Sequence, residues 1–226
     1  MDKIFLGIDV GTQGTRVVCI DSNGEVISES EELFPLQSRI LPDGWHQQDP
    51  YQWWQSTVLC LRKVLREINI SSISAISASS TSGTICLLDE KYLPVMPAIL
   101  YSDRRGEDQA IALNMGLYHI TEKMGYKFNS SYALAKILWV KENMPEVFGR
   151  VKRIVHATDY LIGKLSGNFC VSDYTNVLKT GYDLIDGAWP EKIESIFGIP
   201  IEILPEVVPP GSVIGVVSVR CSEETG

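Results

Sequence analysis

The residues best suited to chemistry lie between two short apolar runs near the start of the chain. From Asp9 to Arg16 the sequence is DVGTQGTR, in which an aspartate ends an expected strand and a glycine-rich turn follows. Glycine lets the backbone approach an anion closely and offer its N–H groups. Thr12 and Thr15 add hydroxyl donors, Arg16 adds a charge that suits phosphate, and Asp9 suits Mg²⁺ held through water. A plain hairpin with a glycine-rich turn is the structural alternative.

Composition and motif spacing exclude several classes of function. The chain contains neither a Walker A loop nor a GxGxxG pattern, which argues against two common nucleotide-binding folds. Its 226 residues carry 20 basic and 28 acidic side chains, a net charge of −8. A nucleic acid or an anionic membrane would select a basic face, so neither is expected as a partner. A phosphate ligand needs only a local site and stays open.

Cysteine usage and the N-terminus favour a cytoplasmic protein. The five cysteines are widely spaced without a CxxC pair, which argues against a zinc site or a disulfide framework. Cys19 and Cys86 lie inside apolar runs and are expected in the core. The start, MDKIFLGIDV, lacks the pattern of a signal peptide, and no apolar run approaches the length of a membrane span.

The candidate turn must be positioned by strands, and three are expected in the first thirty residues. They cover Ile4–Asp9, Arg16–Ile20 and Glu25–Ser30, and DSNG at Asp21–Gly24 is a strong hairpin signal between the last two. A helix should follow the Asp49-Pro50 pair, because aspartate caps helices well and proline suits the first helical position. Its apolar stripe runs at helical spacing to an end near Asn69.

Beyond this helix, strands and helices alternate along the chain. Strands are expected at Ile73–Ser79, Ile85–Leu88, Arg153–His156 and Ser212–Val219, with a short apolar piece at Ala98–Tyr101. Helices are expected at Ser102–Leu113, at Tyr132–Asn143, from Thr158 or Asp159 to about Leu165, and at Trp189–Phe197. Consecutive strands followed by this alternation predict an α/β domain with a mixed sheet.

Several segments together resemble one family. DVGTQGTR is similar to the first phosphate-binding hairpin of the sugar kinase, actin and hexokinase superfamily. The segments GWHQQDPYQWW, ISAISASSTSGTICLLD, PAILYSDRR and LPEVVPPGSVIGVVS resemble, in order, those of the FGGY carbohydrate kinases. The resemblance covers nearly the whole chain. It implies a ribonuclease H-like α/β domain with a mixed sheet flanked by helices.

The resemblance also implies site residues. Phosphate binding is implied for Gly11, Thr12, Gln13 and Arg16, a Mg²⁺ site through water for Asp9, and sugar binding for Ser82, Gly83, Asp103 and Arg104. Without the family, Asp103 could simply cap the following helix, and the loop at Ser82 could be an ordinary polar loop. Trp45 is either a wall of the sugar pocket or a packing aromatic.

For the whole protein, the resemblance implies ATP- and Mg²⁺-dependent phosphorylation of a sugar. Residues 1–226 correspond to the N-terminal, sugar-binding domain, and the STSGT version of the loop favours a ketopentose, D-ribulose or D-xylulose. The catalytic aspartate and the ATP-binding C-terminal domain are expected after Gly226, so the chain alone should hold no catalytic residue and be inactive. Its partners are then the sugar, ATP and its own C-terminal domain.

Three other interpretations remain open at this stage. Within the family, the substrate could instead be glycerol, gluconate or another polyol. A non-catalytic sugar-binding or regulatory domain would keep the fold without the chemistry. A structural, actin-like protein is disfavoured, because it has no need of the elements at Ser82 and Asp103. A homodimer is a further expectation for the isolated chain, because apolar surface meant for another domain would be exposed.

Overall fold

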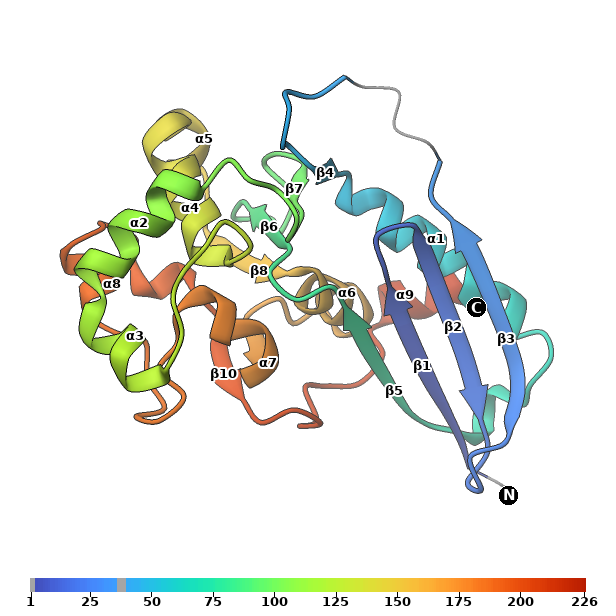
Figure 1. The fold of residues 1–226 in the computed structure, drawn as a ribbon. Helices are drawn as coiled ribbons and strands as arrows, with labels where there is room; N and C mark the ends of the chain where they lie inside the picture. The colour runs from blue at the N-terminus through green and yellow to red at the C-terminus, as the bar shows by residue number, and fades with distance from the viewer. Residues whose placement is uncertain (1–2, 36–39) are drawn as a thin grey trace.

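The computed structural model describes residues 3–35 and 40–226. Its first sheet has four strands in the order β3-β2-β1-β5 (Figure 1), namely β1 (Ile4–Val10), β2 (Gly14–Ile20), β3 (Val26–Leu33) and β5 (Ile73–Ser80). The first three strands are antiparallel, and β5 runs parallel to β1. The sheet is therefore mixed, and the expected antiparallel opening is confirmed.

One face of this sheet is buried and the other is open. Along β1, Leu6, Ile8 and Val10 are buried, while Gly7 and Asp9 are exposed. Helices α1 (Pro50–Val64) and α9 (Val219–Thr225) lie behind the sheet in Figure 1, and no described helix covers its front. Because side chains alternate along a strand, Asp9 is directed to the open face.

Helix α1 begins as the sequence predicts but ends earlier. The Asp49 carboxylate accepts a hydrogen bond from the Tyr51 N–H over 3.0 Å, and Pro50 occupies the first turn. The helix ends at Val64 rather than near Asn69. The Glu67 N–H donates to Val64 O, an i→i−3 bond, so the helical ladder tightens into turns after that residue.

A second sheet lies beside the first and joins segments far apart in sequence. Its order is β4-β7-β6-β8, from β4 (Gln47–Gln48), β7 (Ala98–Ile99), β6 (Ile85–Leu88) and β8 (Arg153–His156). Around it lie α2 (Glu107–Gly116), α3 (Tyr118–Met124), α4 (Ala133–Asn143) and α5 (Pro145–Phe148). Figure 1 shows these helices grouped on the side of the molecule away from β3.

The remaining elements close the fold. They are α6 (Ala157–Ser166), β9 (Val171–Asp173), α7 (Tyr174–Val177), α8 (Lys192–Ser195), β10 (Glu206–Val208) and short 3-10 helices at Ile70–Ser72, Leu178–Thr180 and Ile201–Ile203. The helix expected over Trp189–Phe197 is thus reduced to a single turn, α8. The helix expected over Ser102–Leu113 begins only at Glu107.

The strand expected at Ser212–Val219 is wrong. This segment pairs with no described strand, and Val213 and Val216 remain 92% and 82% exposed. An apolar run forms a strand only where a neighbour accepts its ladder of hydrogen bonds. Instead, the Ser218 hydroxyl accepts from the Cys221 N–H over 3.1 Å and caps α9.

Two hydrophobic cores support the two sheets. The first lies between the β1 sheet, α1 and α6 and contains Trp54, Cys19 and Cys86, and the second surrounds α4 and contains Leu134 and Ile137. The core positions expected for both cysteines are confirmed. Within the described ranges, no helix combines the length and the apolar character that crossing a membrane requires.

Candidate functional site

The turn that joins β1 to β2 is held from two sides. Inside the turn, the Gly11 N–H donates to Gly14 O over 2.9 Å. From outside, the Gln48 side-chain amide donates to Thr12 O over 2.6 Å, and Trp53 Nε1 donates to Gln48 Oε1 over 2.9 Å. Gln48 of β4 therefore bonds the turn directly, and Trp53 of α1 fixes the Gln48 side chain, so the turn keeps its position relative to both elements.

Gly14 ends the turn at a place where no side chain fits. A Cβ atom there would lie 2.6 Å from the Glu32 carbonyl oxygen on β3. Thr12 and Gln13, by contrast, are exposed at the tip of the turn. These two of the predicted phosphate-binding side chains are therefore available to a ligand. Thr15 is fully buried, so the expectation that its hydroxyl is a donor to a ligand is wrong.

Asp9 and Arg16 lie directly opposite each other on β1 and β2. Opposed residues of antiparallel strands share one face of a sheet, so both side chains lie on the open face. Arg16 also donates to the Glu31 carboxylate on β3 over 3.2 Å, with both side chains more than half exposed. An ion pair this exposed is weak, and an incoming phosphate can compete for the guanidinium.

The turn after β1 and the loop after β5 leave the sheet side by side. In the parallel pairing of these strands, Asp9 lies opposite Ser79, and Val10 lies opposite Ser80. Gly11 then begins one connection, and Thr81 begins the other. In α/β folds, ligands bind at the carboxyl ends of parallel strands. The predicted phosphate turn and the predicted sugar loop therefore meet at one edge.

Most hydroxyl groups of the loop after β5 are used to hold the loop. Ser80 Oγ lies 2.6 Å from Thr158 Oγ1, and Thr81 Oγ1 lies 2.8 Å from Thr84 Oγ1. Ser82 Oγ has a longer contact, 3.3 Å to Thr175 O. Of the loop hydroxyls, that of Ser82 is therefore the most easily released to a sugar.

Gly83 is required by backbone conformation and by space. Its φ is +86°, in the left-handed region that favours glycine. A Cβ atom would lie 2.6 Å from Ser131 O and 2.9 Å from Lys179 Cδ. The loop thus packs without a gap against the segment that precedes α4.

Asp103 is completely buried and paired with Arg105. The side chains are 0% and 1% exposed, and Arg105 Nη2 lies 2.7 Å from Asp103 Oδ2. Arg105 Nε donates to the other carboxylate oxygen over 2.8 Å, and the His46 N–H donates to Oδ2 over 2.7 Å. Asp103 does not cap α2, whose N-cap position is Gly106. Both of its oxygens accept hydrogen bonds from protein donors, so the carboxylate holds the Arg105 side chain and the His46 backbone in position.

Arg104 is directed away from Asp103. Its Nε donates to the Glu107 carboxylate over 2.7 Å, and both side chains are more than half exposed. The arginine that pairs with Asp103 is therefore Arg105, which the sequence analysis did not name. The Arg105 guanidinium also lies over the Trp45 ring, 3.8 Å from its centroid, which gives Trp45 a packing role.

A cleft adjoins the hairpin turn. It has a volume of about 550 Å³, and its lining includes Thr12, Gln13, Trp45, His46 and Ser102. His46 Nδ1 lies 2.9 Å from Ser102 Oγ. The cleft therefore combines the tip of the hairpin turn and polar groups near Asp103 with an apolar lining that includes Leu33, Phe34 and Leu100.

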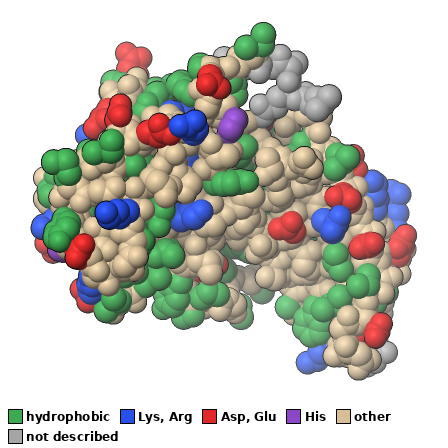
Figure 2. Space-filling view, in the orientation of Figure 1, with side chains coloured by type: hydrophobic (Ala, Val, Ile, Leu, Met, Phe, Trp, Pro, Cys, Tyr) green, Lys and Arg blue, Asp and Glu red, His purple; other side chains and the backbone are tan. Residues whose placement is uncertain are grey.

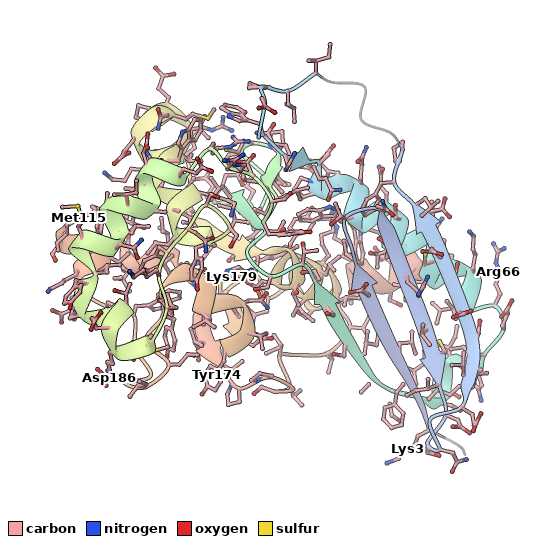
Figure 3. All side chains as sticks on the ribbon, viewed as in Figure 1. Lys3, Arg66, Met115, Tyr174, Lys179 and Asp186 are labelled. Atoms are coloured by element: carbon pink, nitrogen blue, oxygen red, sulfur yellow. The ribbon has the colours of Figure 1, made fainter. Side chains whose placement is uncertain are left out.

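Two lysines that the sequence analysis did not single out contact the loop after β5. Lys179 Nζ donates to Ser82 O over 3.3 Å, and Lys136 Nζ donates to Gly83 O over 3.4 Å. Figure 3 shows Lys179 near the centre of the view, between α7 and the segment that joins β5 to β6. Each lysine is more than fifty residues from the loop in sequence, so no spacing pattern points to it.

The donor set fits Mg²⁺ and the phosphates of ATP. Among the described residues, no group of three or more histidine, cysteine or acidic side chains could hold a metal. Asp9, exposed on the open face, would hold Mg²⁺ through water, and the nucleotide would supply further oxygens, as this hard cation prefers. The turn amides not used inside the turn, Thr12 and Arg16 would supply donors to phosphate. Figure 2 shows acidic and basic side chains interspersed on this face, so the positive charge at the site is local.

Comparison with known proteins identifies the fold and then the family. The mixed sheet flanked by helices is the ribonuclease H-like fold of the actin, hexokinase and sugar kinase superfamily. A gluconate kinase from Lactobacillus acidophilus matches all of this chain with a TM-score of 0.89 and 25% identity, over 46% of its own length. The family model for the FGGY family of carbohydrate kinases, N-terminal domain, matches residues 4–226. The chain therefore belongs to the FGGY family of carbohydrate kinases.

Relatives of similar sequence identity are named as kinases of different substrates. A xylulose kinase from Lactococcus lactis is 30% identical over 96% of this chain and 44% of its own length. A glycerol kinase from Coxiella burnetii is 30% identical over 92% of this chain, again 44% of its own length. The chain thus spans less than half the length of these relatives.

Proposed function

We propose that the protein containing this chain transfers the γ-phosphoryl group of ATP to a hydroxyl of a sugar. Family membership supports this reaction class. The single structural observation that carries it is the parallel pairing of β1 with β5, in which Val10 lies opposite Ser80. This pairing brings the turn after β1, to which we assign phosphate binding, and the polar loop after β5 to one edge of the sheet. Phosphoryl transfer requires such an approach of the two substrates.

The residues of the turn would bind and orient the phosphates. The Gly11 N–H is used inside the turn by Gly14 O. The backbone amides that follow it, the Thr12 and Gln13 side chains and the Arg16 guanidinium offer donors to phosphate oxygens. Asp9, exposed beside Arg16 on the open face, would hold Mg²⁺ through water. Mg²⁺ neutralises charge on the transferred group when it is bound. Fixed donors of this kind stabilise a transition state because they need no reorganisation.

The residues after β5 and β7 would bind the sugar. Ser82 offers a hydroxyl, and Gly83 lets the backbone approach closely. Asp103 would act through the groups it holds, the Arg105 guanidinium and the His46 amide, and Arg104 lies at the rim of the same segment. We propose a ketopentose, D-ribulose or D-xylulose, as the substrate. The small side chains of the loop and the similarity to a xylulose kinase support this choice.

A second domain completes the proposal. Relatives are about twice as long as this chain, and we propose that a C-terminal domain supplies most of the ATP site and the aspartate that accepts the sugar proton. Closure of the two domains would exclude water and limit hydrolysis of ATP. A cytoplasmic location is part of the same proposal.

The direct test measures ADP formation by the full-length protein with D-ribulose, D-xylulose, glycerol and gluconate. Sugar-dependent ADP formation with one ketopentose is expected. Asp9→Asn should lower kcat by about 100-fold while calorimetric sugar binding persists. Asp108→Asn, the same exchange at an exposed site on α2, should leave both unchanged. Sugar binding without any turnover would instead favour a non-catalytic sugar-binding domain.

A further inference from the structure

Lys136 is a buried cation without an ion-pair partner. It lies on α4, and its side chain is 0% exposed. None of the ion pairs found within residues 3–35 and 40–226 includes it. Lysine is almost never fully buried unless it is paired. The position therefore calls for a specific role.

The ammonium group of Lys136 bridges the sugar loop and the start of α4. Its Nζ donates to Gly83 O and to Tyr132 O, each over 3.4 Å. Tyr132 occupies the N-cap position of α4. The neighbouring Ser131 carbonyl oxygen lies 2.6 Å from the position that a Cβ of Gly83 would take. The same two segments are thus in direct contact and joined by one charged donor.

Burial and the surrounding charged groups bring the pKa of Lys136 close to neutral pH. Burial lowers the pKa of Lys136 to about 7, Asp103 opposes this shift, and Lys179 and Arg105 add to it. Asp103 is already committed to Arg105 through two hydrogen bonds. The charge of Lys136 is therefore incompletely neutralised by its surroundings.

On the basis of the kinase activity proposed above, we propose that Lys136 is a positioning residue for sugar binding. Its ammonium group fixes the loop between Ser80 and Thr84 on the start of α4. When that group is lost, the loop moves and the sugar binds more weakly. The phosphate turn is anchored separately, by Gln48 and Trp53, so ATP binding should be spared.

The test uses steady-state kinetics of the full-length protein, varying sugar and ATP separately between pH 6 and pH 9. Lys136→Met should raise the KM for the sugar about tenfold, because hydrogen bonds to charged groups are the stronger ones. The KM for ATP should stay within about twofold. Lys141→Met removes the same charge from the same helix near Gly198 and should change neither constant.

The pH profile separates this role from general destabilisation. In the wild type, the KM for the sugar should rise as the pH passes about 7, because a charged donor holds the carbonyls better than a neutral amine. Lys136→Met should lose this rise. Lys136→Gln, which keeps an N–H donor without the charge, should recover part of the affinity but not the pH dependence.

Several outcomes would overturn the proposal. Equal increases in both KM values would indicate a general structural defect, and an unchanged KM for the sugar would remove the role. A flat wild-type profile would contradict it even if neither variant folds. If no sugar stimulates ADP formation by the wild type, the proposed function itself fails and this inference fails with it. Turnover with an unaltered variant overturns only the inference.

Discussion

We predict a large and a small loss of stability for substitutions in two neighbouring ion pairs, Asp103–Arg105 and Arg104–Glu107. Arg105 and Asp103 are 1% and 0% exposed, whereas Arg104 and Glu107 are 69% and 53% exposed. Asp103→Asn keeps the shape of the side chain but leaves the Arg105 guanidinium buried without its counter-charge. Arg104→Gln removes only an exposed pair three residues apart on the surface. The two substitutions therefore compare a buried and an exposed ion pair within one segment.

The magnitudes follow from burial. Breaking a fully buried ion pair on one side costs about 3–5 kcal/mol, because the remaining charge is uncompensated. An exposed pair contributes about 0.2–1 kcal/mol. For a domain of this size, 1 kcal/mol corresponds to roughly 2–4 °C in melting temperature. Asp103→Asn should therefore lower Tm by about 6–20 °C, and Arg104→Gln by no more than about 4 °C.

The assay is thermal unfolding followed by near-ultraviolet circular dichroism, with urea unfolding as a check on the free energy. Trp45 lies against Arg105 and Trp139, so its signal reports on this region. Equal shifts for the two variants would refute the reasoning. A larger shift for Arg104→Gln would mean that Arg104, not Arg105, is the partner of Asp103.

Three further predictions concern the loop, the hairpin turn and the buried lysine. Gly83→Ala places a Cβ 2.6 Å from Ser131 O at a positive φ. It should lower the urea midpoint more than Gly125→Ala, because Gly125 also has a positive φ but nothing lies within 4 Å of its added Cβ. Gln48→Leu removes the donor to the hairpin turn and leaves the Trp53 indole N–H unpaired, and it should cost about 1–3 kcal/mol in urea unfolding. Burial lowers the pKa of Lys136 from 10.5 to about 7. Between pH 7 and pH 10.5 the unfolded chain therefore binds more protons than the folded chain, so the free energy of unfolding should rise by up to roughly 1.4 kcal/mol per pH unit. Lys136→Met should lose that rise, and parallel pH profiles for the two proteins would contradict the burial of a charged lysine.

Local patterns predicted the elements around the phosphate turn. The apolar run of β1, the DSNG hairpin and the Asp49-Pro50 cap are all encoded within a few residues, and the structure has them in place. The strand expected at Ser212–Val219 failed for a non-local reason, since an apolar run needs a partner strand. The boundary of α2 was missed because Asp103 holds the preceding turn by tertiary bonds.

The candidate site residues likewise divide into those that a local sequence pattern indicates and those that only the fold brings together. The side chains of the phosphate turn are contiguous in sequence, so the pattern alone indicated them. Asp103 is followed by two arginines, and only the fold decides that Arg105 turns inward and Arg104 outward. Lys136 is an ordinary residue in a helical pattern, and its burial against Gly83 depends on how α4 packs. Its contribution was therefore beyond sequence reasoning.

The central claim is the transfer of a phosphoryl group to a sugar, and ³¹P NMR tests it most directly. The full-length protein would be mixed with Mg²⁺, ATP and D-ribulose or D-xylulose. A new phosphomonoester signal from a sugar phosphate, growing as the γ-phosphate signal of ATP declines, is the predicted result. Release of inorganic phosphate without a sugar phosphate, or unchanged ATP with every sugar, would contradict the account.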